Sequence, residues 1–115
     1  MSISYKLTKY KSYKNPILEL DGDVVSEHYE KNLDNQIPNA KGECVLCGKS
    51  ITKNSYSIVA TGGNMYNLIH KTDWDFAENN KNQDGSFMGG WDIGPACYKK
   101  VKHIPEIKDY VRKDF

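Results

Sequence analysis

Three cysteines on two short stretches are the residues whose types and spacing could do chemistry. Residues 44–49 are Cys-Val-Leu-Cys-Gly-Lys, and residues 94–97 are Gly-Pro-Ala-Cys. Two thiolates separated by two residues can face one metal ion, and a small Gly48 lets the backbone turn back beside them. Pro95 favours a helix start, which places Cys97 where the positive helix N-terminus stabilises a thiolate. Cys44, Cys47 and Cys97 therefore predict one zinc site.

The fourth ligand of this site is not evident from the motif. A structural zinc site has four protein ligands, and the sequence contains three cysteines. The position three residues after Cys97 is Lys100, whose positive charge disfavours metal binding. We favour His70, because it ends a predicted strand at a point where the chain could pass the cysteines. The alternatives are Asp92, His103, His28 and a water molecule.

Two explanations without a metal stay open for the same cysteines. A Cys-x-x-Cys pair can be redox-active, but the thioredoxin-like pair ends a strand and leads into a helix, whereas the residues after Cys47 favour a strand. The cysteines could also be small buried apolar residues. An odd number of cysteines disfavours a disulfide framework.

The N-terminal third supplies weaker signals. Apolar residues alternate with polar ones over residues 3–7, which predicts a half-buried strand. Residues 17–25 predict a hairpin with a tight Asp21-Gly22 turn, and Ser26 is placed to cap a short helix.

The rest of the chain carries the elements that must position the cysteines. Residues 55–60 and 65–70 alternate and predict a hairpin closed by a glycine-rich turn. Thr72 is predicted to cap a short helix, and the polar residues 78–86 are predicted to be the most mobile internal segment.

The C-terminal part is predicted to be a bent or broken helix in which Pro105 starts a new turn, with Cys97, Val101 and Ile104 on one face. A knuckle, a hairpin and a helix-borne ligand in this order are typical of a treble clef. We therefore predict one α+β domain over residues 1–115, a small zinc-stabilised fold of two β-hairpins with a knuckle and a C-terminal helix. Residues 1–40 would form an N-terminal extension and residues 41–115 the zinc core.

Composition narrows the functional classes. Of the 115 residues, 16 are Lys or Arg and 15 are Asp or Glu, so the net charge of +1 gives no global electrostatic case for nucleic acid. No apolar run reaches the roughly 18 residues of a membrane span, and the first residues lack the apolar region of a signal peptide. These features predict a cytoplasmic protein.

Several residues could nevertheless form a partner surface. Lys9 is interleaved with Tyr10 and Tyr13, a pattern that can stack bases while pairing phosphates. Lys99 and Lys100 lie on the predicted basic helix, and Trp91 is an aromatic residue expected at the surface.

Residues 44–49 and 93–100 resemble a family of small zinc-ribbon-like domains that are frequent in bacteriophage and prophage genomes. Those domains combine a Cys-x-x-Cys-Gly-Lys/Arg motif with a Gly-x-Gly-Pro-x-Cys motif and a basic helix. Here the interval from Cys47 to Cys97 is longer, and Trp91-Asp92-Ile93 replaces the first glycine of the later motif. The resemblance implies a zinc site and a phage or prophage origin in a bacterial host cell, and no activity.

We therefore expect a non-enzymatic, zinc-stabilised protein that docks on a host or phage protein. The alternative is a nucleic-acid-binding zinc module. A metal-dependent hydrolase or nuclease is a third hypothesis, with Asp92 or Asp73 as the candidate general base, but no His-Glu pair at helical spacing supports it. Neither a membrane nor a small-molecule substrate is indicated.

Overall fold

The computed structural model describes residues 3–10, 13–21, 24–38, 40 and 42–115, and it shows a small α+β protein built on antiparallel sheets. In the main sheet the strands follow the order β1 (Tyr5–Thr8), β2 (Ile17–Leu20), β6 (Asn67–Leu68), β5 (Tyr56–Ala60) and β7 (Gly89–Ile93). A further strand, β8 (Arg112–Lys113), also pairs with β5. A separate two-stranded sheet joins β3 (Gly42–Glu43) to β4 (Ser50–Ile51).

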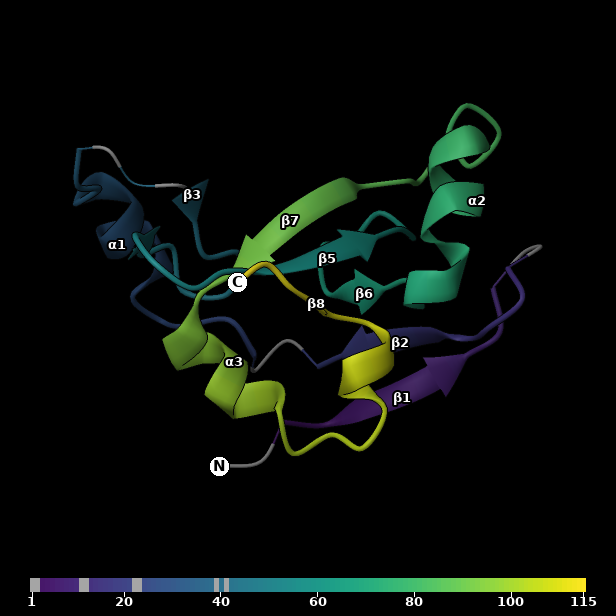
Figure 1. Cartoon of the computed structure of the whole chain (residues 1–115), viewed down its shortest axis with the longest axis horizontal. Helices are drawn as coiled ribbons and strands as arrows, with labels where there is room; N and C mark the ends of the chain where they lie inside the picture. Colours follow the sequence, from purple (N-terminus) through teal and green to yellow (C-terminus); the bar gives the residue numbers. More distant parts are fainter. Residues whose placement is uncertain (1–2, 11–12, 22–23, 39, 41) are drawn as a thin grey trace.

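Short helices lie around these sheets. They are α1 (Tyr29–Asp34), η2 (Lys71–Asp73), α2 (Trp74–Asn79), α3 (Pro95–Val101) and η3 (Ile107–Asp109). Figure 1 shows α1 and β3 at one end of the molecule and α2 at the other. None of the helices in the described part of the chain has the length and apolar character needed to cross a membrane.

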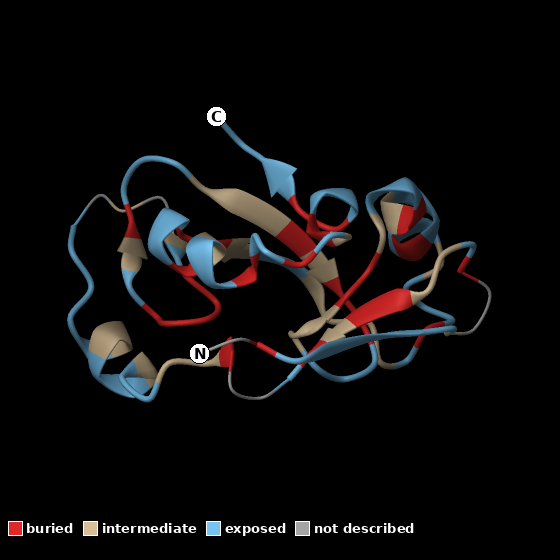
Figure 2. Cartoon of the chain, turned by 90° about the horizontal axis from the view of Figure 1, so that it is seen from below, coloured by how far each residue is buried: buried red, intermediate tan, exposed pale blue. Residues whose placement is uncertain are grey.

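The apolar side chains form two clusters of unequal size. The larger one joins the sheet to the cysteines and to the residues of α3 and η3, and it includes Leu18, Ile58, Ile93, Val101, Ile104 and Ile107. The smaller one, beside α2, consists of Tyr13, Ile17, Ile69 and Ala77. Each fully buried aliphatic side chain contributes roughly 1.5–3 kcal/mol, so the larger cluster supplies most of the apolar stabilisation. Figure 2 shows where the buried segments lie along the ribbon.

The predicted hairpin of residues 55–70 is confirmed. Ala60 of β5 pairs antiparallel with Leu68 of β6, and the turn between them contains Gly62 and Gly63 at φ values of +75° and +70°. Such positive φ values are accessible to glycine at little cost. By contrast, β7 was not predicted, because Gly89 and Gly90 supply no strand signal. This strand is instead stabilised by antiparallel pairing of its five residues with β5.

The predicted hairpin of residues 17–25 is wrong. Strand β2 pairs with β1 on one side and with β6 on the other. The amide of Val24 donates to the carbonyl of Asp21 in a turn. Ile17, Leu18 and Leu20 are buried, so β2 is an interior strand that needs two neighbours. Gly22 and Asp23 of the predicted turn lie outside the described residues.

The first predicted strand exists, but it is not half-buried. All four residues of β1 are exposed, including Tyr5 at 38% and Leu7 at 42%, whereas Ile3, just before the strand, is buried. Because β1 is at the edge of the sheet, its alternating pattern does not lead to burial of one face.

Neither predicted helix cap is found. The hydroxyl of Ser26 accepts from the amide of His28 at 3.1 Å, but α1 begins only at Tyr29, and His28, the residue preceding it, makes no side-chain cap bond. Thr72 is not the cap of α2. Instead, Nδ1 of His70 accepts from the amide of Thr72 at 3.2 Å and caps η2. The side chain of Asp73, the residue preceding α2, makes no cap bond to that helix.

The C-terminal prediction is confirmed in part: the helix and its buried side are present, but α3 ends at Val101, and the last element is strand β8, which was not predicted. Helix α3 begins at Pro95, and Cys97, Val101 and Ile104 are buried on one side of it. After Pro105 the chain continues in η3, where Ile107 is also buried. This single buried face holds the helix-borne cysteine against the sheet.

Candidate metal centre

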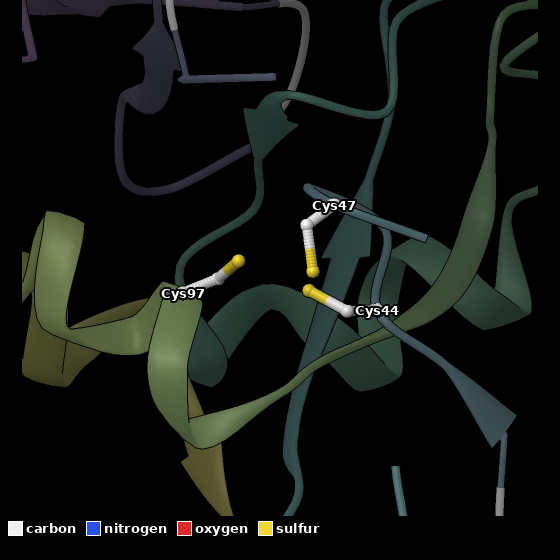
Figure 3. Close-up of side chains that lie close together, drawn as sticks. All are labelled: Cys44, Cys47 and Cys97. Carbon is white, nitrogen blue, oxygen red and sulfur yellow. The ribbon is translucent and has the colours of Figure 1, made fainter. Parts of the chain in front are cut away.

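The structure brings the three cysteines together. The Sγ atoms of Cys44, Cys47 and Cys97 all lie within 4.8 Å of one another, and the side chains are buried, at 1%, 8% and 4% exposure. Figure 3 shows Cys97 pointing from α3 toward the pair on the β3–β4 hairpin. All three are free thiols. Such a cluster can hold a metal ion.

The hairpin between β3 and β4 shapes the first half of the centre. The amide of Cys44 donates to the carbonyl of Lys49 at 2.9 Å, and the amide of Gly48 donates to the carbonyl of Cys44 at 2.8 Å. Gly48 has φ of +77°, and an added Cβ would lie 2.6 Å from the carbonyl oxygen of Tyr29. Glycine is required here both for the turn and for the close approach of α1.

The second half of the centre is fixed by β7. The amide of Val45 donates to the carbonyl of Asp92 at 2.8 Å, which joins the hairpin to β7 just before α3. An added Cβ on Gly94 would lie 3.7 Å from Cβ of Cys44. The strand therefore places the start of α3, and with it Cys97, directly against the first cysteine.

Hydrogen bonding makes the cluster a ready site for a cation. A bond from the Cys97 thiol, followed by backbone amides including that of Leu46 (3.4 Å from the sulfur), lowers the pKa of Cys44 to about 5 against the effect of burial. The pKa of Cys97 is raised, first by this bond to Cys44 and then by burial. The direction of the shift favours the thiolate form of Cys44, which is the form that binds a metal ion.

Two hollows flank the sulfurs. The α1 hollow, of about 380 Å³, lies between α1 and the start of α3 and is lined by His28, Lys31 and Lys100 together with two cysteines. The β4 hollow, of about 230 Å³, lies beside β4 and is lined by all three cysteines. Cys47 and Cys97 line both hollows. The centre can therefore be approached from two sides.

The structure does not bring His70 to the three sulfurs. Its Nδ1 faces the amide and hydroxyl of Thr72, and its ring lies 5.1 Å from that of Tyr110. In the described part of the chain, the group of clustered cysteines, histidines and acids contains the three cysteines alone. His70 is held elsewhere because it caps η2.

The other fourth-ligand candidates, like His70, lie outside the cluster that the three sulfurs form in the described part of the chain. Asp92 is on β7, where burial and then the charge of Asp114 raise its pKa. His103 is exposed beyond the end of α3. His28 lines the α1 hollow together with Cys47 and Cys97. His28 is thus the candidate whose side chain borders the same space as the sulfurs.

The predicted partner-surface residues divide into two groups. Lys9, Lys99 and Lys100 are exposed, and Trp91 is exposed at 36% on β7. Tyr10 and Tyr13 instead turn inward, and their rings lie 5.8 Å apart. They do not form the exposed stacking platform that base recognition needs.

A buried carboxylate, Asp84, explains why these tyrosines turn inward. Its exposure is 7%, and its oxygens accept from Tyr13 at 2.8 Å, from Tyr10 at 3.4 Å and from the hydroxyl of Thr61. The hydroxyl and amide of Ser86 donate to it as well. The segment 78–86, predicted to be mobile, is therefore anchored at Asp84.

A second buried acid completes this arrangement. Asp73, at 2% exposure, accepts from the backbone amides of Lys14 and Asn15 at 3.3 and 3.0 Å. Neither acid was singled out for this role. The partners that residues 10–15 provide for Asp73 and Asp84 are 58 to 74 residues away, and Thr61 is 23 residues from Asp84, whereas sequence periodicity reports only local neighbours.

Together these contacts define two centres, one of sulfur and one of carboxylate, at opposite ends of the sheet. Comparison of the chain with protein-family models, with curated proteins and with solved structures finds no match, so the function is inferred from this geometry alone.

Proposed function

We propose that this chain is a non-enzymatic, zinc-stabilised protein that docks on a protein partner through strand β1. The metal centre would hold the fold together, and β1 would make the contact. We extend the proposal to a phage or prophage origin and a place in the cytoplasm of a bacterial host, in keeping with the resemblance of the two cysteine motifs.

Sulfur spacing supports zinc as the metal. Tetrahedral zinc with bonds of about 2.3 Å to sulfur separates its sulfur ligands by about 3.8 Å, and the three sulfurs lie within 4.8 Å of one another. The β3–β4 hairpin, the β5–β7 pair and α3 follow one another as in a treble clef, with β6, η2 and α2 inserted between β5 and β7.

The surroundings of the sulfurs support a structural role for this metal. Apart from the cysteines, the β4 hollow, which all three sulfur-bearing residues line, is lined by lysines and by hydroxyl and apolar residues, and these described residues include no histidine or carboxylate to act as a general base. A hydrolytic zinc centre pairs an open coordination position with such a base. A buried three-cysteine centre is instead suited to stabilising a small fold.

The observation that carries the docking function is the exposure of β1. Within the described part of the chain β1 pairs with β2 alone, and it exposes Tyr5 and Leu7 at 38% and 42%. An edge strand with exposed apolar residues can accept an extended segment of another chain, with backbone bonds giving affinity and pockets giving specificity. A hollow of about 360 Å³ beside Tyr5 provides such a pocket.

Lysines placed on an edge strand disfavour pairing between copies of the same chain. Lys6 lies between the two apolar residues and is 3.9 Å from Glu19 on β2, with its side chain 74% exposed. The edge is therefore better suited to a different partner, and acidic residues beside the partner's strand would match Lys6.

The test is capture of a partner from a lysate of the encoding organism by the immobilised full chain. Leu7→Ser should reduce the retained polypeptide at least about tenfold, because central apolar anchors dominate such interfaces. Ile37→Ser is the matched control, since Ile37 is exposed at 50% outside the sheet. Equal retention by both variants, or retention of nucleic acid with no specific polypeptide, would contradict the proposal.

One observation favours nucleic acid as a second candidate partner. The rings of Tyr56 and Tyr98 stack at 4.0 Å, and they border a hollow of about 310 Å³ that is also lined by Lys71, Lys108 and Lys113. Such a site could hold a phosphate beside an aromatic face. Binding of a single-stranded oligonucleotide should then weaken steeply with salt, and a flat response would remove this candidate.

A further inference from the structure

We propose that His28 is the fourth ligand of the metal centre, which would make it a Cys₃His site closed by rotation of one side chain. This inference rests on the proposed zinc site and adds the residue that completes it. Among the residues described as lining the two hollows, the usual zinc ligands are the three cysteines and His28, which can bind zinc through a ring nitrogen.

The backbone around His28 is fastened to the cysteine hairpin. The amide of Ser26 donates to the carbonyl of Leu46 at 2.8 Å, and Nδ2 of Asn32 donates to the carbonyl of Cys47 at 2.7 Å. Between these two bonds, the carbonyl of Tyr29 lies against Gly48, as the lack of room for a Cβ there shows. The backbone that carries His28 is therefore held against the cysteine hairpin, and His28 lines the α1 hollow together with Cys47 and Cys97.

The imidazole of His28 is held weakly where it is. Its side chain is 66% exposed, and its Nε2 lies 3.5 Å from the carboxylate of Glu27, which is 87% exposed. An ion pair between two such exposed groups contributes little to stability. Turning the ring into the α1 hollow, which has about 380 Å³ of space, thus gives up little and gains a metal bond.

The charges around the α1 hollow fit the completed site. Three thiolates, one neutral imidazole and one zinc ion carry a net charge of minus one, and Lys31, Lys49 and Lys100 line the same hollow. The three ammonium groups would offset that charge. Lys100, which stands where a treble clef often has its fourth ligand, would then serve as a counter-charge.

The experiment uses the full chain reconstituted with Co²⁺ in place of zinc, because the visible spectrum of Co²⁺ reports its ligands. His28→Ala should weaken metal binding on the order of 100-fold and change the ligand-field bands, whereas the sulfur-to-metal charge-transfer band stays. His28→Cys should restore affinity with a spectrum of four sulfur ligands. His70→Ala and His103→Ala are matched controls that should leave the ligand-field bands unchanged.

The outcomes separate this inference from the proposed zinc site. If His28→Ala binds Co²⁺ with the affinity and spectrum of the unchanged chain, the fourth ligand is another group and the inference is overturned, while the zinc site stands. If the unchanged chain shows no sulfur-to-metal charge transfer, the zinc site itself fails. Because His28 is exposed, the substitution leaves the buried clusters intact, and circular dichroism of the variant checks this.

Discussion

The two ends of the sheet hold their loops by different chemistry. At one end, beside α1, three cysteines from residues 44–97 meet within 4.8 Å. At the other end, beside α2, Asp84 gathers hydroxyls from Tyr10, Tyr13 and Thr61. The sulfur end could hold a metal ion, whereas the carboxylate end gathers its hydrogen-bond donors from the protein itself. The comparison suggests that the two ends should respond differently to the removal of a metal.

The largest effect is expected at the sulfur end. Cys44→Ser, or chelation of the metal, should lower the free energy of unfolding by about 5 kcal/mol or more, because binding energy of a structural zinc is folding energy. Denaturant titration with and without chelator measures this. After metal removal, the amide of Gly48 should lose protection from hydrogen exchange. The amide of Gly63, which donates to the carbonyl of Ser86, should lose less protection.

Two outcomes would contradict this contrast between the two ends. Full metal-free stability of both Cys44→Ser and Cys97→Ser would mean that the cysteines are only buried apolar residues. Equal loss of protection at both ends would mean that the two centres belong to one cooperative unit rather than to two.

An intermediate effect is expected from Asp84→Asn. The amide has a single acceptor oxygen, and its NH₂ group faces donors. Either the hydroxyls of Tyr13 and Thr61, which share Oδ2, or the donors from Tyr10 and Ser86, which share Oδ1, therefore lose their acceptor, at a cost of about 3 kcal/mol. The denaturation midpoint should fall while the affinity for Co²⁺ stays unchanged. Asp75→Asn, at an exposed position of α2, is the control and should change neither. Loss of metal affinity in Asp84→Asn would show that the two ends are coupled.

The same contrast explains what the sequence could and could not predict. The cysteine pair, Gly48 and Pro95 form local motifs whose geometry follows from spacing, and the structure places them as expected. The Asp84 cluster depends on hydrogen bonds between residues far apart in the sequence, and these cannot be predicted from a local hydrophobic pattern. β2 was assigned the wrong neighbour for the same reason, since its partners are set by burial on both sides.

A miss at the metal centre has a different physical cause. His70 was favoured because it ends a strand near the hairpin, but a nearby amide competes for its ring nitrogen, and the cap of η2 takes it. The signal for His28 is tertiary, because it depends on α1 lying against Gly48. Local spacing could not have shown that contact.

The smallest effect is expected from alkaline pH, and it acts at the carboxylate end. Burial, followed by the hydrogen bond to Asp84, raises the pKa of Tyr13 above the ordinary value of 10.0. The folded protein therefore keeps the Tyr13 proton longer than the unfolded chain does. The stability that this contributes is fully present below pH 10.0 and is lost as pH rises toward the higher folded pKa, at about 1.4 kcal/mol per pH unit.

The free energy of unfolding is measured from about pH 9 to about pH 12 for the unchanged chain and for Tyr13→Phe. Other buried tyrosines such as Tyr110 also have raised pKa values, but both proteins contain them, so the difference between the two isolates the contribution of Tyr13. The slope above pH 10.0 should be shallower in Tyr13→Phe, and an identical slope would contradict the assignment. Acid should act on the other end, since protonated thiols release a metal. Alkali thus loosens the tyrosine end with the metal still bound, and acid releases the metal with the Tyr13 bond intact.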